Sequence, residues 1–128
     1  EPFAAGLAAR KATPADIAGL RRLAAAMEQP QHTAESLALA DLEFHLALAE
    51  ASKNPFMRSV GNLIEAALVG IFKLSSPAAD RDKIAEVAHS HQAIVEAIAR
   101  RDPAGACRAM EQVILVGMER VRAALAGR

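Results

Sequence analysis

Apolar residues recur about every three to four positions along most of the chain, which is the period of an amphipathic α-helix. Alanine and leucine dominate these segments, whereas the β-branched and aromatic runs typical of strands are missing. Breaks in the period fall near residues 29–32 and 75–77. The pattern predicts helices at 2–11, 14–29, 34–52, 55–75, 81–100 and 103–126.

Several of these helices begin with a capping residue that is followed by proline. Thr13-Pro14, Asn54-Pro55 and Asp102-Pro103 each place an N-cap side chain before proline at the first helical position. The connections are short, so consecutive helices should pack as antiparallel neighbours. The sequence therefore predicts an all-α antiparallel bundle of about six helices, in one domain that spans residues 1–128.

The composition narrows the classes of function. Lysine and arginine balance aspartate and glutamate, 15 against 15, and aromatic residues make up only 3% of the chain. This composition argues against nucleic-acid binding by this chain alone. No apolar run approaches the roughly 20 residues of a membrane span and no signal peptide is recognisable, so we expect a cytoplasmic protein without membrane partners. The chain opens at Glu1 rather than methionine, which suggests a piece of a longer protein.

Two predicted helices carry polar residues on their apolar faces. At a rotation of about 100° per residue, Asp41 and His45 both fall inside the apolar arc of the third predicted helix. In the fifth predicted helix, His91 falls inside the apolar arc, whereas His89 falls on the polar face. We therefore expect Asp41, His45 and His91 to point into the bundle and His89 to face water.

A carboxylate and two imidazoles inside a bundle need partners, because an unpaired buried polar group is costly. One interpretation is a divalent cation held by Asp41, His45 and His91, since an Asp and a His four residues apart can converge with a His from a facing helix. The other is an Asp–His hydrogen bond with a separately satisfied histidine. The spacing alone leaves both interpretations open.

Other polar motifs are weaker. Glu86-x-x-His89 is half of the signature of di-iron carboxylate bundles, but the second copy is missing and both residues lie on the polar face. In the fourth predicted helix, Arg58, Asn62 and Glu65 share one stripe. That stripe is either a solvated face or the polar lining of a ligand pocket. Gly-rich phosphate loops and nucleophile elbows are absent from the sequence.

Several segments together resemble one family. They are Asp41-Leu42-Glu43-Phe44-His45, Ala51-Ser52-Lys53-Asn54-Pro55, residues 91–98, Arg101-Asp102-Pro103 and residues 106–110, with residues 7–13 near the start. In this order they resemble the FCD domain, the C-terminal sensing domain in the fatty-acid-regulator branch of GntR-type repressors. The resemblance covers essentially the whole chain, and its specificity lies in the set rather than in any single motif.

The resemblance implies a bundle around a central ligand cavity, preceded in the intact protein by a winged helix-turn-helix that makes the DNA contacts. Many members hold a divalent metal with one Asp and three His, and small carboxylates fill its open positions. Others bind their ligands without metal. Asp41, His45 and His91 match the first three ligands, but the fourth position is Val113, which cannot ligate. This departure leaves three alternatives open. The site has three protein ligands for a metal, or it binds metal only weakly, or it is a polar pocket that binds no metal.

We therefore expect an effector-binding homodimer that is not an enzyme and has no catalytic residues. The effector would be a small organic acid, in a pocket lined by Arg58, Asn62 and Val113, with zinc, nickel or manganese as the possible metal. A small metal-dependent enzyme is one alternative, although the sequence offers no convincing catalytic base or nucleophile beside the ligands. A structural dimerisation module is another, although its core would more cheaply use leucine than three polar residues.

Overall fold

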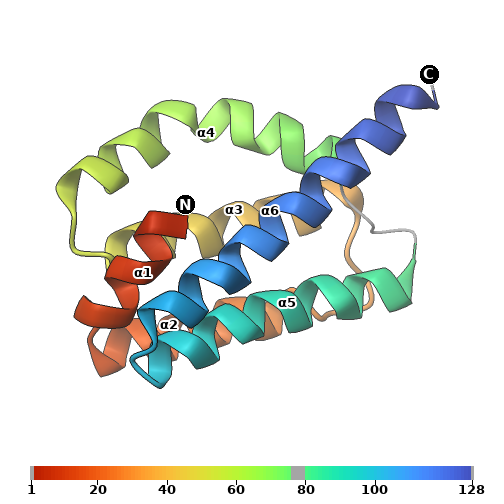
Figure 1. Ribbon diagram of the computed structural model, residues 1–128. Coiled ribbons are helices and arrows are strands. Elements are labelled where there is room, and N and C mark those ends of the chain that lie inside the picture. The colour runs from red at the N-terminus through yellow and green to blue at the C-terminus, as the bar shows by residue number, and fades with distance from the viewer. Residues whose placement is uncertain (1, 76–79, 128) are drawn as a thin grey trace.

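The computed structural model describes residues 2–75 and 80–127, and these residues form helices without any strand (Figure 1). The prediction of an all-α bundle of six helices is thereby confirmed. The predicted break at 75–77 lies largely outside the described residues. The helices are α1 (Pro2–Lys11), α2 (Pro14–Ala26), α3 (Ala34–Ala51), α4 (Pro55–Ser75), α5 (Arg81–Ala99) and α6 (Pro103–Ala126).

The predicted capping residues define the starts of three helices. At α2, the Thr13 hydroxyl accepts the amide of Asp16 at 3.1 Å, and the Asp16 carboxylate accepts the amide of Thr13 at 2.9 Å. Asn54 and Asp102 each accept a first-turn amide at 2.9 Å, at the starts of α4 and α6. These bonds satisfy amides for which the helix itself has no carbonyl, so the starts are fixed locally.

The end of α2 differs from the prediction, since the helix stops at Ala26 rather than at residue 29. The residues after Ala26 explain the early end, because Pro30 has no N–H to donate to the Ala26 carbonyl four residues earlier. The Nε2 atom of His32 donates to the carbonyl of Ala26 at 2.8 Å, and its Nδ1 lies 2.9 Å from the Ser36 hydroxyl. The imidazole therefore satisfies a carbonyl that Pro30 leaves without its α-helical donor, and it ties the end of α2 to the first turn of α3.

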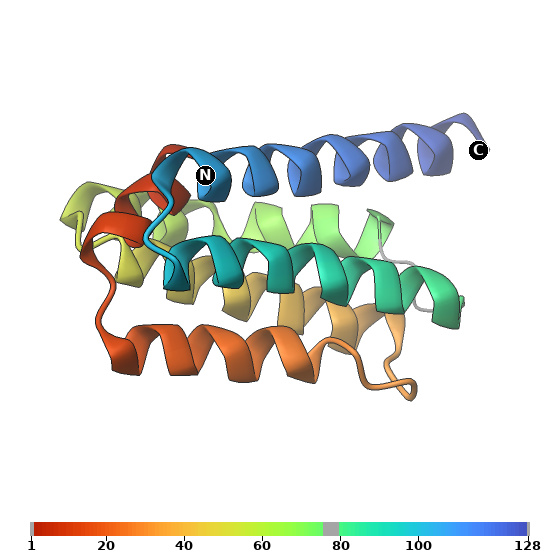
Figure 2. The same cartoon turned by 60° about the horizontal axis from the view of Figure 1, so that its bottom comes forward.

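The helices pack as antiparallel neighbours, with α1 across one end of the bundle (Figures 1 and 2). Figure 2 shows α5 between α2 and α6, and both of these helices pack against it. Helix α3 packs against α2 and α4, while α4 also contacts α6. This arrangement brings the middle of α3 opposite the middle of α5, which are the segments that carry Asp41 and His91.

The core is built from large apolar side chains on α2, α3, α5 and α6 and from small ones on α1. Phe44, Leu48, Ile94 and Met110 are completely excluded from solvent. The buried residues of α1 are all alanines, namely Ala4, Ala5, Ala8 and Ala9. Among the described residues, every helix is too short or too polar to cross a membrane.

Candidate metal centre

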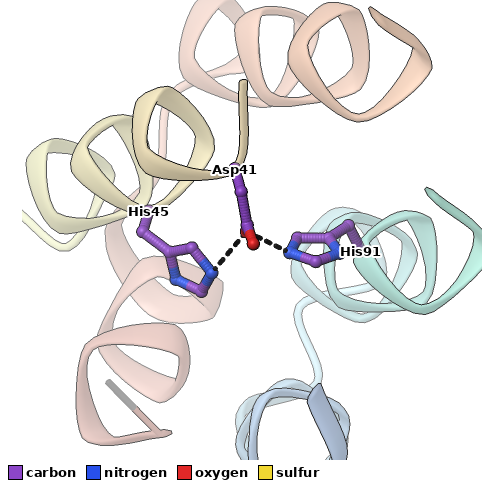
Figure 3. A group of neighbouring side chains, drawn as sticks. All are labelled: Asp41, His45 and His91. Atoms are coloured by element: carbon purple, nitrogen blue, oxygen red, sulfur yellow. Dashed lines mark hydrogen bonds and ion pairs between the residues drawn. The ribbon is translucent and has the colours of Figure 1, made fainter. Parts of the chain in front are cut away.

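Helix α3 positions the first two side chains of the centre. Asp41 and His45 are four residues apart, so they lie on the same face of the helix. The Nε2 atom of His45 lies 3.1 Å from Oδ1 of Asp41 (Figure 3). Both side chains point away from solvent, because Asp41 is half-buried and His45 is buried. One turn of α3 therefore supplies one carboxylate and one imidazole to the interior.

Helix α5 supplies the second imidazole, which is fixed in place from three sides. The Nδ1 atom of His91 donates to the carbonyl of Val87 at 2.7 Å, one turn earlier in the same helix. Its Nε2 atom lies 3.0 Å from Oδ1 of Asp41, and its ring packs edge-on against Phe44 with centroids 4.9 Å apart. Only 1% of His91 is exposed, so this ring has one orientation available.

This arrangement constrains the protons of His91. The carbonyl of Val87 requires a proton on Nδ1, so the neutral ring presents a lone pair at Nε2. A lone pair that faces the carboxylate oxygen of Asp41 is unfavourable. Either a second proton makes the ring an imidazolium, or a cation lies between the ring nitrogen and the carboxylate. This arrangement therefore favours a positive charge next to Nε2 of His91 and Oδ1 of Asp41.

The ionisation of Asp41 follows from the same contacts. Burial on its own raises the pKa of this carboxyl group, because a charged group is poorly solvated inside the bundle. The hydrogen bonds from His45 and His91, together with the charges of these rings, outweigh burial and hold the pKa of Asp41 well below its usual range. Asp41 is therefore a carboxylate, the form that can bind a cation.

The residues present fit a small divalent cation. One ligand atom from each of Asp41, His45 and His91 can be chosen such that all lie within 4.8 Å of one another. Ligand atoms around a tetrahedral zinc ion lie about 3.4 Å apart, as follows from bonds of about 2.1 Å. Shifts on the order of 1 Å, which side-chain rotations can supply, would bring these three ligand atoms to the spacing that a zinc ion requires. Two nitrogens and one carboxylate oxygen suit zinc, nickel and manganese.

The structure brings Asp41, His45 and His91 together, as the sequence predicts, and it separates them from the other histidine of α5. His89 is two-thirds exposed, and its Nε2 atom lies 3.7 Å from the carboxylate of Glu28. Glu86 is exposed as well. The prediction that His89 faces water is confirmed, and the Glu86-x-x-His89 motif does not join the centre.

The three residues predicted to line an effector pocket lie in different environments. Arg58 pairs with Glu50 at 3.4 Å, both side chains are more than half exposed, and both line a shallow pocket at the corner of α3 and α4. Asn62 is exposed, and the side chain of Glu65 lies outside the described part of α4. Val113 is half-buried against the core. The roles of Arg58, Asn62 and Val113 in effector binding stay predictions.

One charged residue near the centre was missed by sequence reasoning. Arg120 of α6 is half-buried, and it lies close enough to Asp41 and Glu86 for their charges to act on it. Burial lowers the pKa of the Arg120 guanidinium, and these two carboxylates partly restore it. A signal was available, since Arg120 lies seven residues after Val113, two turns along the same stripe of α6.

Comparison with known proteins gives one informative result. The family model of the FCD domain matches residues 1–115, which include all three side chains of the centre. Comparison with curated proteins gives no significant match. The matched segment covers most of the chain and runs from α1 into the second half of α6. The chain therefore belongs to the FCD family, the effector-binding domains of transcription regulators.

Proposed function

We propose that this domain senses a small organic acid for a GntR-type transcription regulator, through a divalent cation bound by Asp41, His45 and His91. One observation carries the proposal: two buried imidazoles from different helices direct their Nε2 atoms at the same carboxylate oxygen. Such a cluster costs free energy in a purely structural core, because its groups lose their hydration. A cation would use all three groups at once.

The incomplete ligand set supports an effector role for the cation. Three protein ligands leave at least one coordination position open in a tetrahedral site, and more in an octahedral one. Val113, at the position where the family resemblance expects a fourth histidine, occupies less space than an imidazole and cannot ligate. An oxygen of a carboxylate effector would fill the open position. Zinc, nickel and manganese all accept this combination of nitrogen and oxygen donors.

Regulation requires that the effector binds two conformations of the domain unequally. The centre joins α3 to α5, so occupancy would favour conformations with one particular separation of these helices. In the intact protein, a winged helix-turn-helix joined to this domain would make the DNA contacts.

We propose a homodimer, because a regulator of this kind reads a two-fold symmetric operator. Exposed apolar side chains on α6 support a second copy of this chain as the partner. Leu115, Met118 and Leu125 are each about half exposed, at 55%, 45% and 53%, and they fall on one side of the helix.

Native mass spectrometry of protein purified without chelator tests the proposal, since it reports bound metal, carried-over ligand and oligomeric state together. The expected spectrum contains one divalent ion per chain. A parallel melting experiment adds Zn²⁺ and then organic acids, and each true ligand should raise the melting temperature. Protein that carries no metal and gains no thermal stability from Zn²⁺, Ni²⁺ or Mn²⁺ would contradict the metal-dependent function.

A further inference from the structure

Phe44 lies against both imidazoles of the centre. It follows Asp41 by three residues on α3 and directly precedes His45, so it shares the inward face of that helix. Its side chain is completely excluded from solvent. The ring of Phe44 contacts the ring of His45 with centroids 5.8 Å apart, and it contacts the ring of His91 with centroids 4.9 Å apart. One apolar side chain thus touches the histidines of two different helices.

The three rings stand at nearly right angles to one another. The planes of Phe44 and His45 and the planes of Phe44 and His91 both meet at 84°. The two imidazole planes meet at 83°, with centroids 5.5 Å apart. Edge-to-face contacts are favourable, because the positive edge of one ring meets the negative face of the other. A tilt of either imidazole would therefore disturb its contact with the phenyl ring.

The contact with Phe44 becomes more important when a cation occupies the centre. In its absence, Asp41 helps to orient the rings, since its Oδ1 lies 3.1 Å from Nε2 of His45 and 3.0 Å from Nε2 of His91. A cation bound through these nitrogens takes their lone pairs, and neither nitrogen can then carry a proton for Asp41. The carbonyl of Val87, which accepts from Nδ1 of His91 at 2.7 Å, and the ring of Phe44 are unaffected by this change.

The orientation of each ring determines whether its nitrogen can reach the cation, because the lone pair lies in the plane of the imidazole. We infer that Phe44 is the positioning residue of the centre, and that its ring holds His45 and His91 in the orientation in which both bind the cation. The inference rests on the proposed function and deepens it. An aliphatic side chain would fill a similar volume, but it offers no flat face against which an imidazole can rest.

The experiment measures Zn²⁺ affinity by calorimetry in the parent, Phe44→Leu, Phe44→Tyr and the control Ile98→Val. Ile98 is fully buried on α5, seven residues after His91, and the control removes one methyl group from the core. Phe44→Leu should bind Zn²⁺ about tenfold to a hundredfold more weakly, as is typical when residues that orient metal ligands are lost. Phe44→Tyr keeps the ring and should stay close to the parent, as should Ile98→Val.

Urea unfolding in EDTA separates positioning from a general loss of core packing. Phe44→Tyr buries an added hydroxyl group and should be less stable than the parent, although its folded form keeps the Zn²⁺ affinity. If Zn²⁺ affinity follows stability in EDTA across all four proteins, Phe44 acts only as a core residue and the inference is overturned. Should Phe44→Leu fail to fold, Phe44→Met takes its place, because methionine adapts to irregular space without supplying a ring. Should Phe44→Tyr fail to fold, the comparison of Phe44→Leu with Ile98→Val decides.

The visible absorption of bound Co²⁺ gives a readout of coordination geometry that stability alone does not move. At saturating Co²⁺, Phe44→Leu should show shifted or weakened bands, whereas Ile98→Val should reproduce the parent spectrum. Equal Zn²⁺ affinity and equal Co²⁺ spectra in the parent and Phe44→Leu would overturn the inference and leave the metal centre standing. A parent that binds neither Zn²⁺ nor Co²⁺ would refute the metal-dependent function, and the role of Phe44 with it.

Discussion

Replacement of Asp41 by asparagine tests the centre with the smallest change of shape. The amide has the size of the carboxylate, but it carries no charge. Oδ1 of Asp41 lies 3.0 Å from Nε2 of His91 and 3.1 Å from Nε2 of His45, so it can accept a hydrogen bond from each protonated ring nitrogen. A bond to a charged acceptor contributes about 1 kcal/mol more than a neutral one, so Asp41→Asn should lower the free energy of unfolding by about 2 kcal/mol. For a chain of this length, that corresponds to about 7 °C in melting temperature.

Zinc should enlarge the difference between the two proteins. At a free concentration of one hundred times its dissociation constant, Zn²⁺ stabilises the parent by about 2.7 kcal/mol. Asp41→Asn lacks the anionic ligand and should lose most of this gain. Urea unfolding at pH 6 in EDTA gives the first number, and the same titration at pH 7.5 with buffered Zn²⁺ gives the second. His89→Ala is the matched control, because it removes an exposed imidazole only two residues from His91.

Two results would refute this reasoning. If Asp41→Asn is as stable as the parent in EDTA, the two hydrogen bonds contribute nothing and the cluster is not organised around its carboxylate. If Zn²⁺ stabilises Asp41→Asn as much as the parent, the ion binds elsewhere. A loss of zinc stabilisation in His89→Ala would point to the surface of α5 as that other place.

Three further predictions address the neighbouring residues. Val113→His should supply a fourth ligand and raise Zn²⁺ affinity by at least about tenfold, since even hydrogen-bond partners of metal ligands contribute that much; no gain in a Zn²⁺ titration would mean that the position does not face the centre. Lys53 at 2.7 Å, followed by Thr13, lowers the pKa of Asp16 below 3.8, so this carboxylate stabilises the fold above that pH and the contribution disappears as pH falls through the lowered pKa. Asp16→Asn should therefore lose about 1 kcal/mol in urea unfolding at pH 7 and progressively less below pH 3.8, and a loss that is independent of pH would contradict the assignment. Light scattering at tens of micromolar should find a dimer that Met118→Glu dissociates, whereas a monomeric parent would remove the dimer from this domain.

Sequence reasoning succeeded where the determining physics is local. A rotation of about 100° per residue was enough to separate His91 from His89 and to place Asp41 beside His45. Capping chemistry likewise fixed the helix starts, because an N-cap side chain and its amide are only two or three residues apart.

The remaining features depend on how helices pack against one another. The end of α2 is further fixed by His32, six residues beyond Ala26, and the period of the helix does not encode that contact. The partners of Arg58 and Arg120 depend on the relative shift of neighbouring helices, which a single helical wheel does not contain. The sequence indicated the polar stripe of α4, but it did not indicate how far α4 is shifted along α3. That shift places Arg58 beside Glu50 rather than beside Asp41.

The alanine face of α1 has a mechanical consequence. Alanine has no side-chain torsion that can change rotamer, so the buried residues of α1 present a nearly smooth surface to α3, α5 and α6. Interlocked leucine and isoleucine side chains resist sliding because each must leave its groove. Between α1 and α6, a shear of a fraction of an ångström requires no such repacking. A small displacement of α6 along its own axis could thus pass α1 without being transmitted to it, so the first helix is mechanically decoupled from such a motion.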